Sequence, residues 1–337
     1  MKMENPLEPA QSIKELIEKW GDLYRNVKDG NDTDVRYLKG RDPEWGTYDQ
    51  HGTNRLRLTY YLFFEQIDDE KTIEMLFREE LSDRETNSFQ GIGAALEFLT
   101  CLLRKYNTDN RYDGLFTRAK EANFDCACGY DKNVEISCDL REYSVFDCIS
   151  IAVSTEAFDC AEKLVQLWKD SVTDWTEKEY KRLISLNKQI HREADNEEAL
   201  AFLLAAKRKT GKNRDVISAW NDLISYEMRF GTYEQAYRNF IEMRDHTLLS
   251  EIYRINLFNR ILENCLELAT EYPEKAESLW SWAKPFLEKK VGESGMYGNL
   301  YVKGIRAAKA AGDIYAEKLS KNYETWKETM HYGGKKP

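Results

Sequence analysis

Cysteines are the residues whose type and spacing come closest to a metal site. Cys126 and Cys128 are followed by Cys138 and Cys148, and thiolates are preferred ligands of closed structural zinc sites. Zinc-binding cysteine pairs usually have roughly two to four residues between them, whereas Cys126 and Cys128 have a single one. No histidine lies near these cysteines to complete a mixed site. The spacing therefore favours buried, reduced thiols, and the sequence predicts no metal and no cofactor.

A second group that could do chemistry is an aromatic and polar stretch between residues 28 and 54. It contains Trp45, Tyr48, Asp49 and His51, and it lacks helical periodicity. Loops carry binding and catalytic residues disproportionately. These four residues are therefore an alternative loop site, which would suit an unrecognised hydrolase or transferase. The simpler interpretation, which we favour, is that Trp45 and Tyr48 pin the loop onto the first helices.

Recognisable catalytic motifs are absent from the sequence. Gly91 and Gly93 form half of a dinucleotide-binding fingerprint, but no predicted strand precedes them and the third glycine is missing. We interpret the two glycines as permitting close helix packing. The chain has no Walker motif, no His-Glu-x-x-His pair and no nucleophile elbow. An enzyme is accordingly disfavoured.

The charge of the chain argues against nucleic acid as a partner. Its 59 acidic and 49 basic residues give a formal net charge of −10, whereas binding to phosphates draws on a basic surface. A local basic cluster consists of the run 207–209 with Lys212 and Arg214. Cations near a helix end also complement the helix dipole, and we prefer that interpretation of the cluster.

Length and composition indicate a folded protein. The 337 residues are 42% apolar, which is enough for a sizeable core. No apolar run approaches the roughly 20 residues that span a bilayer, and the N-terminus lacks a signal-peptide pattern. Seven cysteines without regular spacing indicate a reducing compartment. We therefore expect a cytoplasmic protein without membrane contact.

The elements that must position these residues are mostly helices. Only six prolines interrupt a chain rich in straight-chain helix formers, and apolar residues recur at helical spacing over most of its length. One helix is predicted from Ile13 to Val27, and one short strand at 134–136. The predicted organisation is a helical region 1–122 with a long loop 28–54, an irregular connecting segment 123–140, helical hairpins over 141–331, and a tail 332–337.

Small residues repeat along the C-terminal part at a nearly constant interval. Five alanines follow one another at spacings of 38, 37, 40 and 40 residues: Ala161, Ala199, Ala236, Ala276 and Ala316. A period of this size is typical of stacked helical hairpins, in which a small residue on the second helix lets it approach the first. The sequence therefore predicts five hairpins.

The segment 217–244 resembles the tetratricopeptide repeat. Six of its residues fall at the spacings of that signature: Trp220, Leu223, Gly231, Tyr233, Ala236 and Phe240. The resemblance extends more weakly over residues 142–331. It implies an all-α fold, an irregular α-α superhelix of stacked hairpins that is tetratricopeptide-like in its C-terminal part. It also implies a concave binding groove lined by the first helix of each hairpin.

The resemblance places the binding groove on two helices. Its residues would be Asn221, Asp222, Ser225, Met228 and Arg229 on one helix, and Phe146, Asp147 and Ser150 on another. The lysine and asparagine pair with which some relatives clamp a terminal carboxylate is not evident here. The leading hypothesis is thus a non-enzymatic protein that binds a protein or peptide. An immunity protein that neutralises a toxin by direct binding is the alternative, because acidic, motif-poor helical proteins resemble several such families.

Overall fold

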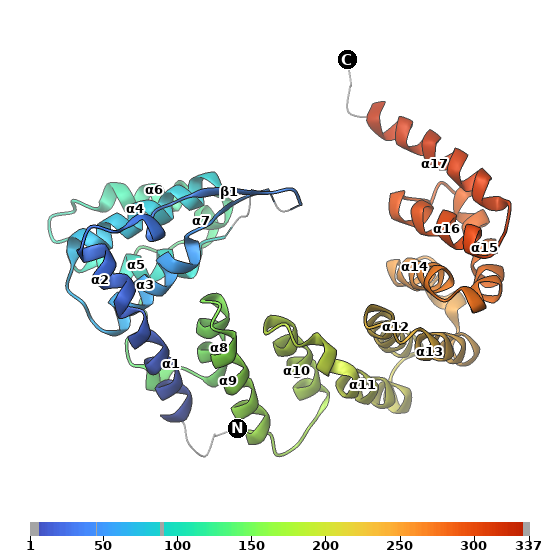
Figure 1. Ribbon diagram of the computed structural model, residues 1–337, viewed down its shortest axis with the longest axis horizontal. Helices are drawn as coiled ribbons and strands as arrows, with labels where there is room; N and C mark the ends of the chain where they lie inside the picture. The colour runs from blue at the N-terminus through green and yellow to red at the C-terminus, as the bar shows by residue number, and fades with distance from the viewer. Residues whose placement is uncertain (1–6, 45, 88–90, 333–337) are drawn as a thin grey trace. The chain divides into compact units, whose positions relative to one another are not determined.

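Helices make up most of the computed structural model, which describes residues 7–44, 46–87 and 91–332. Within these ranges the only strands are β1 (Lys39–Asp42) and β2 (Gly46–Asp49), so the all-α prediction is confirmed (Figure 1). Contacts divide the chain into two compact units, residues 1–173 and 174–337. The segment 123–140 lies inside the first unit. All but the first residue of the predicted tail 332–337 lies outside the described residues.

The first unit is a bundle of short helices. Packing joins α3 to α4 and α5, α4 to α6, and α8 to α9, while α1 contacts α3, α8 and α9. Aromatic rings fill the space between α3 and α5, where Phe63 and Phe98 meet edge to face at 4.8 Å. The helices of this unit are α1 (Leu7–Lys19), α2 (Gly21–Lys28), η1 (Thr33–Val35), α3 (Gly52–Phe64), α4 (Glu70–Thr86), α5 (Ala94–Arg104), α6 (Asp113–Glu121), α7 (Phe124–Gly129), η2 (Leu140–Glu142), α8 (Val145–Ser154) and α9 (Phe158–Ser171).

The helix predicted from Ile13 to Val27 is two helices. The chain breaks at Trp20, and α2 begins at Gly21 and packs against α3. A β-carbon on Gly21 would lie 3.3 Å from the ring of Tyr61, so the absence of a side chain there permits the close approach. Apolar periodicity does not register such a break because both helices bury the same face.

Two further predictions about local structure are wrong. Residues 28–54 contain η1 and an antiparallel hairpin in which Lys39 pairs with Asp49 and Asp42 with Gly46. Residues 134–136, by contrast, are not assigned to a strand and belong to an irregular connection between α7 and η2. Alternation of apolar and polar residues does not make a strand without a neighbouring strand to bond.

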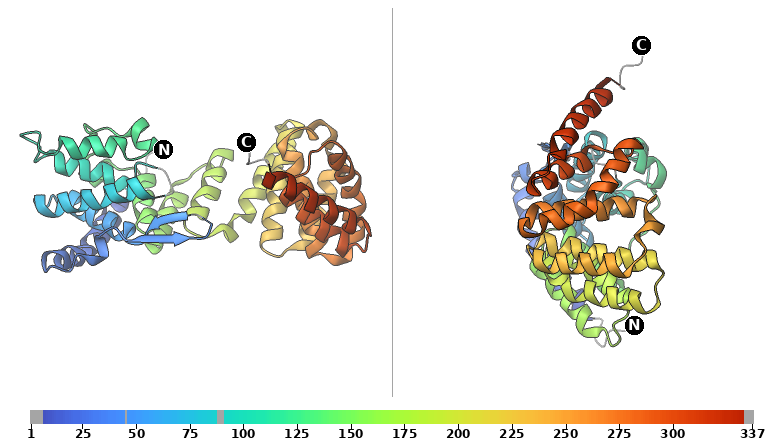
Figure 2. Two further views of the ribbon diagram at one scale, coloured as in Figure 1. Left: turned by 90° about the horizontal axis from the view of Figure 1, so that it is seen from above. Right: turned by 90° about the vertical axis from the view of Figure 1, so that its right-hand side faces the viewer.

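The second unit is a succession of helical hairpins. Its first and second helices pair as α10 with α11, α12 with α13, α14 with α15, and α16 with α17, and Figure 2 shows them as successive layers. The helices are α10 (Glu177–Gln189), η3 (Glu193–Asn196), α11 (Glu197–Thr210), α12 (Asn213–Arg229), α13 (Tyr233–His246), η4 (Leu249–Ile252), α14 (Asn256–Glu271), η5 (Pro273–Lys275), α15 (Ala276–Gly292), α16 (Gly298–Ala310) and α17 (Tyr315–Tyr332).

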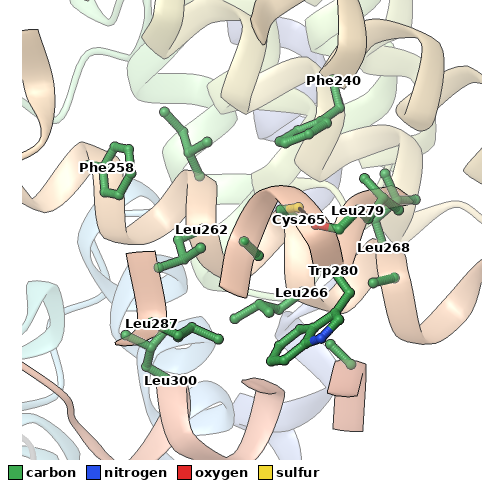
Figure 3. Packing of buried hydrophobic residues seen from close by; sticks show 14 of the residues in the cluster. Phe240, Phe258, Leu262, Cys265, Leu266, Leu268, Leu279, Trp280, Leu287 and Leu300 are labelled. Atoms are coloured by element: carbon green, nitrogen blue, oxygen red, sulfur yellow. Dashed lines mark hydrogen bonds between the residues drawn. The ribbon is translucent and has the colours of Figure 1, made fainter. Parts of the chain in front are cut away.

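An apolar cluster connects these hairpins. It runs from Leu204 on α11 to Leu319 on α17, and Figure 3 shows its centre around Leu266 and Trp280. The indole nitrogen of Trp280 keeps a polar partner, since it donates a hydrogen bond to Asp313 at 2.7 Å. The cluster explains why no single hairpin needs a core of its own.

The five alanines of the predicted period are all buried on second helices. Ala161, Ala199, Ala236, Ala276 and Ala316 lie on α9, α11, α13, α15 and α17, with at most 6% of each residue exposed. The prediction of five helical hairpins is therefore confirmed. In the described ranges, no helix combines the length and the apolar character that crossing a membrane requires.

Candidate functional site

Asp49 and His51 of the predicted loop site make hydrogen bonds at the ends of the β1–β2 hairpin. One Asp49 oxygen accepts hydrogen bonds from the backbone N–H groups of Leu38 and His51, both at 3.0 Å. His51 Nδ1 lies 3.0 Å from the carbonyl oxygen of Arg36. Tyr48 is 47% exposed, and Trp45 lies outside the described residues. Asp49 and His51 are thus engaged in local structure.

The other Asp49 oxygen enters a buried ion-pair network. It lies 2.5 Å from the guanidinium of Arg55, a completely buried side chain. Arg55 also pairs with Glu80 at 2.8 Å, and Arg84 pairs with Glu80 and Asp83. Burial alone would lower the pKa of Arg55, but the carboxylates of Glu80 and Asp49 raise it above its ordinary value. Buried charges persist only with such compensation, so we assign this network a role in folding.

Gly93 lies in close contact with this ion-pair network. It has a φ of +80°, and a β-carbon there would lie 3.1 Å from Glu80 Oε1 and 3.2 Å from Arg84 Nη1. Gly93, the second glycine of the half-fingerprint, thus permits a close contact between the beginning of α5 and the charged side chains of α4.

The four cysteines of the metal hypothesis lie in different environments. Cys126 and Cys148 are buried, whereas Cys128 and Cys138 are exposed. Burial raises the pKa of the Cys148 thiol to about 12, which keeps it protonated. Among the described residues, no three or more His, Cys, Asp or Glu side chains are placed to hold a metal ion.

Some of the groove residues predicted on α12 lie at its contact with α14, and others lie on the surface. Asn221 is buried and accepts a hydrogen bond from Asn264 of α14 at 3.0 Å, and Ser225 accepts from the same amide at 2.7 Å. These two residues therefore join neighbouring hairpins. Asp222 is exposed and pairs with Arg260 of α14 at 3.0 Å.

Two other residues predicted to line the groove, Met228 and Arg229, lie at the C-terminal end of α12. Met228 is half-buried against the apolar cluster, while Arg229 is exposed and lies 3.3 Å from Glu193. The predicted face of α12 is thus mainly the surface on which the next hairpin packs, with Asp222 and Arg229 accessible to a ligand.

The residues predicted on α8 belong to the first unit. Asp147 forms a capping box with Ser144 at the start of α8, and the ring of Phe146 packs edge to face on Trp168 at 5.8 Å. Ser150 is exposed on the same helix. Capping accounts for Asp147 and packing for Phe146, while the side chains of Asp147 and Ser150 are both exposed to solvent.

Two adjoining pockets form an open groove along the first turns of α12. One, of about 290 Å³, is lined by residues of α10, α11 and α12, and the other, of about 650 Å³, lies between the beginnings of α12 and α14. Asp215 and Ser218 line both pockets. We call this continuous depression the α12 groove.

Asp222 lines the smaller of the two pockets of the α12 groove. Its side chain is 47% exposed, yet burial among the surrounding helices raises the pKa of its carboxyl, against the opposing effect of Arg260. A carboxylate that is open to water and also surrounded by protein lies on a hollow surface. Of the residues predicted from the repeat, only Asp222 lines this groove.

Three of the five cations of the α12 groove come from the basic cluster of residues 207–214. Lys207 lies in the last turn of α11, as the dipole interpretation predicts. Lys212 and Arg214, however, lie at the opposite kind of helix end, the beginning of α12. The basic cluster 207–214 was thus the available signal for this groove.

A pocket of about 800 Å³ in the first unit was not indicated by the sequence. It lies beside α1 and is lined by more acidic than basic side chains, which are Glu8, Glu15, Glu65, Asp139, Lys14 and Arg141. The acidic lining of this pocket agrees with the net charges of the two units. Residues 1–173 hold 34 acidic and 22 basic residues, a net −12, whereas residues 174–337 hold 25 and 27, a net +2.

Comparison with known proteins adds no identification. No protein-family model, no curated protein and no solved structure matches the chain. Function is therefore inferred from the grooves, charges and contacts described above.

Proposed function

We propose that this chain is a non-enzymatic binding protein whose second unit holds a segment of a partner protein or peptide in the α12 groove. The observation that carries the proposal is the continuity of that groove across three successive hairpins, through residues of α10, α11, α12 and α14. Stacked helical hairpins commonly bind extended segments on such surfaces.

The tetratricopeptide-like character of α12 and α13 supports this proposal. Trp220, Leu223, Ala236 and Phe240 are buried, as the repeat signature requires. Gly231 lies between the two helices with a φ of +77°, a conformation that glycine adopts without strain. The signature residues thus have structural roles suited to such a repeat.

A selection from a random peptide library displayed on phage, with the full chain as bait, tests the proposal. Ser218 lies in both pockets, so Ser218→Trp should obstruct the groove and abolish binding of the selected peptides. Ser281→Trp, an exposed position on α15, is the matched control and should leave binding unchanged. The proposal fails if no peptide is enriched, or if Ser218→Trp binds the enriched peptides as tightly as the native chain does.

A second candidate is an immunity protein that binds a basic toxin through its first unit. The net charge of −12 and the acidic pocket beside α1 favour it, because charge complementarity accelerates association with a basic partner. The expected result is protection of cells that produce a basic toxin encoded beside this protein. Glu8→Lys together with Glu15→Lys should reduce the protection, and unchanged protection would argue against this site.

A further inference from the structure

The α12 groove is positively charged in a protein that is negative as a whole. Two carboxylates line it, Asp215 and Asp222, against five cations. Its local charge is therefore +3, while the chain carries −10. The cations are Lys181, Lys207, Lys212, Arg214 and Arg260.

Three of these cations have partners within the protein. Lys207 lies 2.6 Å from Glu177, Lys181 lies 3.8 Å from the same carboxylate, and Arg260 lies 3.0 Å from Asp222. The larger pocket, between α12 and α14, holds two more cations and one carboxylate, Asp215.

Lys212 and Arg214 are those cations. Neither has an ion-pair partner among the residues that the structure describes, and both line the larger pocket with Arg260. They precede and begin α12, where the positive end of the helix dipole disfavours cations. An anionic ligand would relieve this mutual repulsion.

We propose that the larger pocket of the α12 groove binds an acidic segment, rich in Asp and Glu, of the partner polypeptide. The inference rests on the proposed function, because it names the chemistry of the ligand for the same groove. Lys212, Arg214 and Arg260 bind carboxylates of that segment by charge-assisted hydrogen bonds. Ser218 and Asn256, which line the same pocket, add neutral donors.

The two groove carboxylates favour a peptide over a nucleic acid. Asp215 and Asp222 accept hydrogen bonds, and an extended peptide offers backbone N–H donors between its acidic side chains. A nucleic-acid strand instead presents a phosphate at every nucleotide, which would face these two carboxylates unfavourably.

Fluorescence anisotropy of the full chain with a fluorescein-labelled peptide of alternating Glu and Gly tests the inference. The Glu peptide should bind, with an affinity that falls as salt is added. The matching peptide with Gln in place of Glu should bind at least about tenfold more weakly. Lys212→Glu with Arg214→Glu should weaken binding of the Glu peptide by about tenfold or more, because repulsion replaces attraction.

The control variant carries the same change of charge away from the groove. Lys309→Glu with Lys321→Glu alters exposed positions on α16 and α17 and should change the affinity by less than about twofold. Circular dichroism should show both double variants folded, since glutamate is favoured in the first turn of a helix such as α12.

Several outcomes would overturn the inference. It fails if the Glu peptide binds the groove variant as tightly as the native chain, or if a labelled oligonucleotide of equal charge binds more tightly through Lys212 and Arg214. It also fails, with the proposed function intact, if library peptides that depend on an open groove at Ser218 contain no acidic residues. Failure to select any groove-dependent peptide would count against the proposed function itself.

Discussion

The two units bury polar groups of different kinds. In the first unit, Arg55, Glu80 and Asp83 are at least 97% buried and form charged pairs. In the second, most buried polar side chains are amides, such as Asn221 and Asn239, within an extensive apolar cluster. The second unit therefore relies on a repeated apolar pattern, and the first on a particular set of charges.

Removing Arg55 should have the largest effect and should be confined to the first unit. Arg55→Met leaves the carboxylates of Asp49 and Glu80 buried without their main partner. Breaking a buried ion pair on one side typically costs about 3–5 kcal/mol of unfolding free energy. Urea unfolding gives the free energy. Hydrogen exchange followed by mass spectrometry should show that the substitution accelerates exchange, relative to the native chain, more in α3 and α4 than in α12 and α13.

A surface arginine provides the control for that experiment. Arg238 pairs with Glu234 on α13, and both side chains are more than 60% exposed. Arg238→Met should therefore change the stability by no more than about 0.5 kcal/mol. Equal effects of the two substitutions would show that the buried network does not distinguish the first unit.

In the second unit, the repeated alanines should be most sensitive to added volume. Ala236 is completely buried, whereas its neighbour Gln235 is exposed. Ala236→Leu should cost about 1–3 kcal/mol by overpacking the contact of α12 with α13. Gln235→Leu should stay within about 0.5 kcal/mol. If urea unfolding ranks the two substitutions in the reverse order, the repeat register is wrong.

The hairpins were predictable because periodic packing leaves a periodic sequence. Each second helix needs a small residue where it meets the first, and Ala161 and Ala236 meet that need in the same way. Apolar residues at helical spacing also indicated helices over most of the chain, and Leu58 of α3 and Leu99 of α5 are two such residues, both buried. Local propensity and packing agree at these positions, so the sequence pattern alone is sufficient.

The buried charges were not predictable by the same reasoning. Glu80 and Asp83 lie on an amphipathic helix, where acidic residues usually belong to the solvated face. Their burial depends on Arg55, which is about 25 residues away, and on the β1–β2 hairpin that brings Asp49 to the same place. Such long-range compensation has no short-range pattern.

The residues of the α12 groove were likewise only partly predictable from the sequence. The basic cluster is visible in the sequence, but Arg260 joins it only because α14 packs beside α12. The repeat signature directed attention to Asn221 and Ser225, which proved to join the two helices. A hairpin signature indicates which helices are first and second, but not which residues of the first helix the next hairpin covers.

Replacing Gly93 is a further test of the charged network of the first unit. Gly93→Ala should cost about 1–2 kcal/mol, because alanine tolerates positive φ poorly and its β-carbon would approach Glu80. Gly114, in the first turns of α6 with open space around it, is the matched control. Gly114→Ala should stabilise the chain by about 0.5–1 kcal/mol, since it lowers the entropy of the unfolded state. A melting temperature that moves in the same direction for both variants would contradict this account.

The smallest expected effect is a pH dependence from Glu227 in the second unit. Glu227 is 97% buried on α12, its Oε1 accepts a hydrogen bond from Asn239, and its Oε2 has no hydrogen-bond partner. Burial raises the pKa of this carboxyl above its ordinary value of 4.5, although the bond from Asn239 acts against that shift. The folded state therefore holds the proton at a pH at which the unfolded chain has released it.

The sign of this effect follows from proton binding. Because the folded state binds more protons than the unfolded state, the contribution of Glu227 to stability falls as pH rises from 4.5 through the raised pKa. Glu227→Gln removes this titration and should make the protein more stable at pH 7 by about 1 kcal/mol, with the gain lost near pH 4. Glu234→Gln, on the surface of α13, should stay within about 0.5 kcal/mol at both pH values. Urea unfolding at the two pH values measures all four differences, and a gain for Glu227→Gln that is larger at pH 4 would show that the carboxyl is stabilised by its surroundings, in the manner of the charges in the first unit.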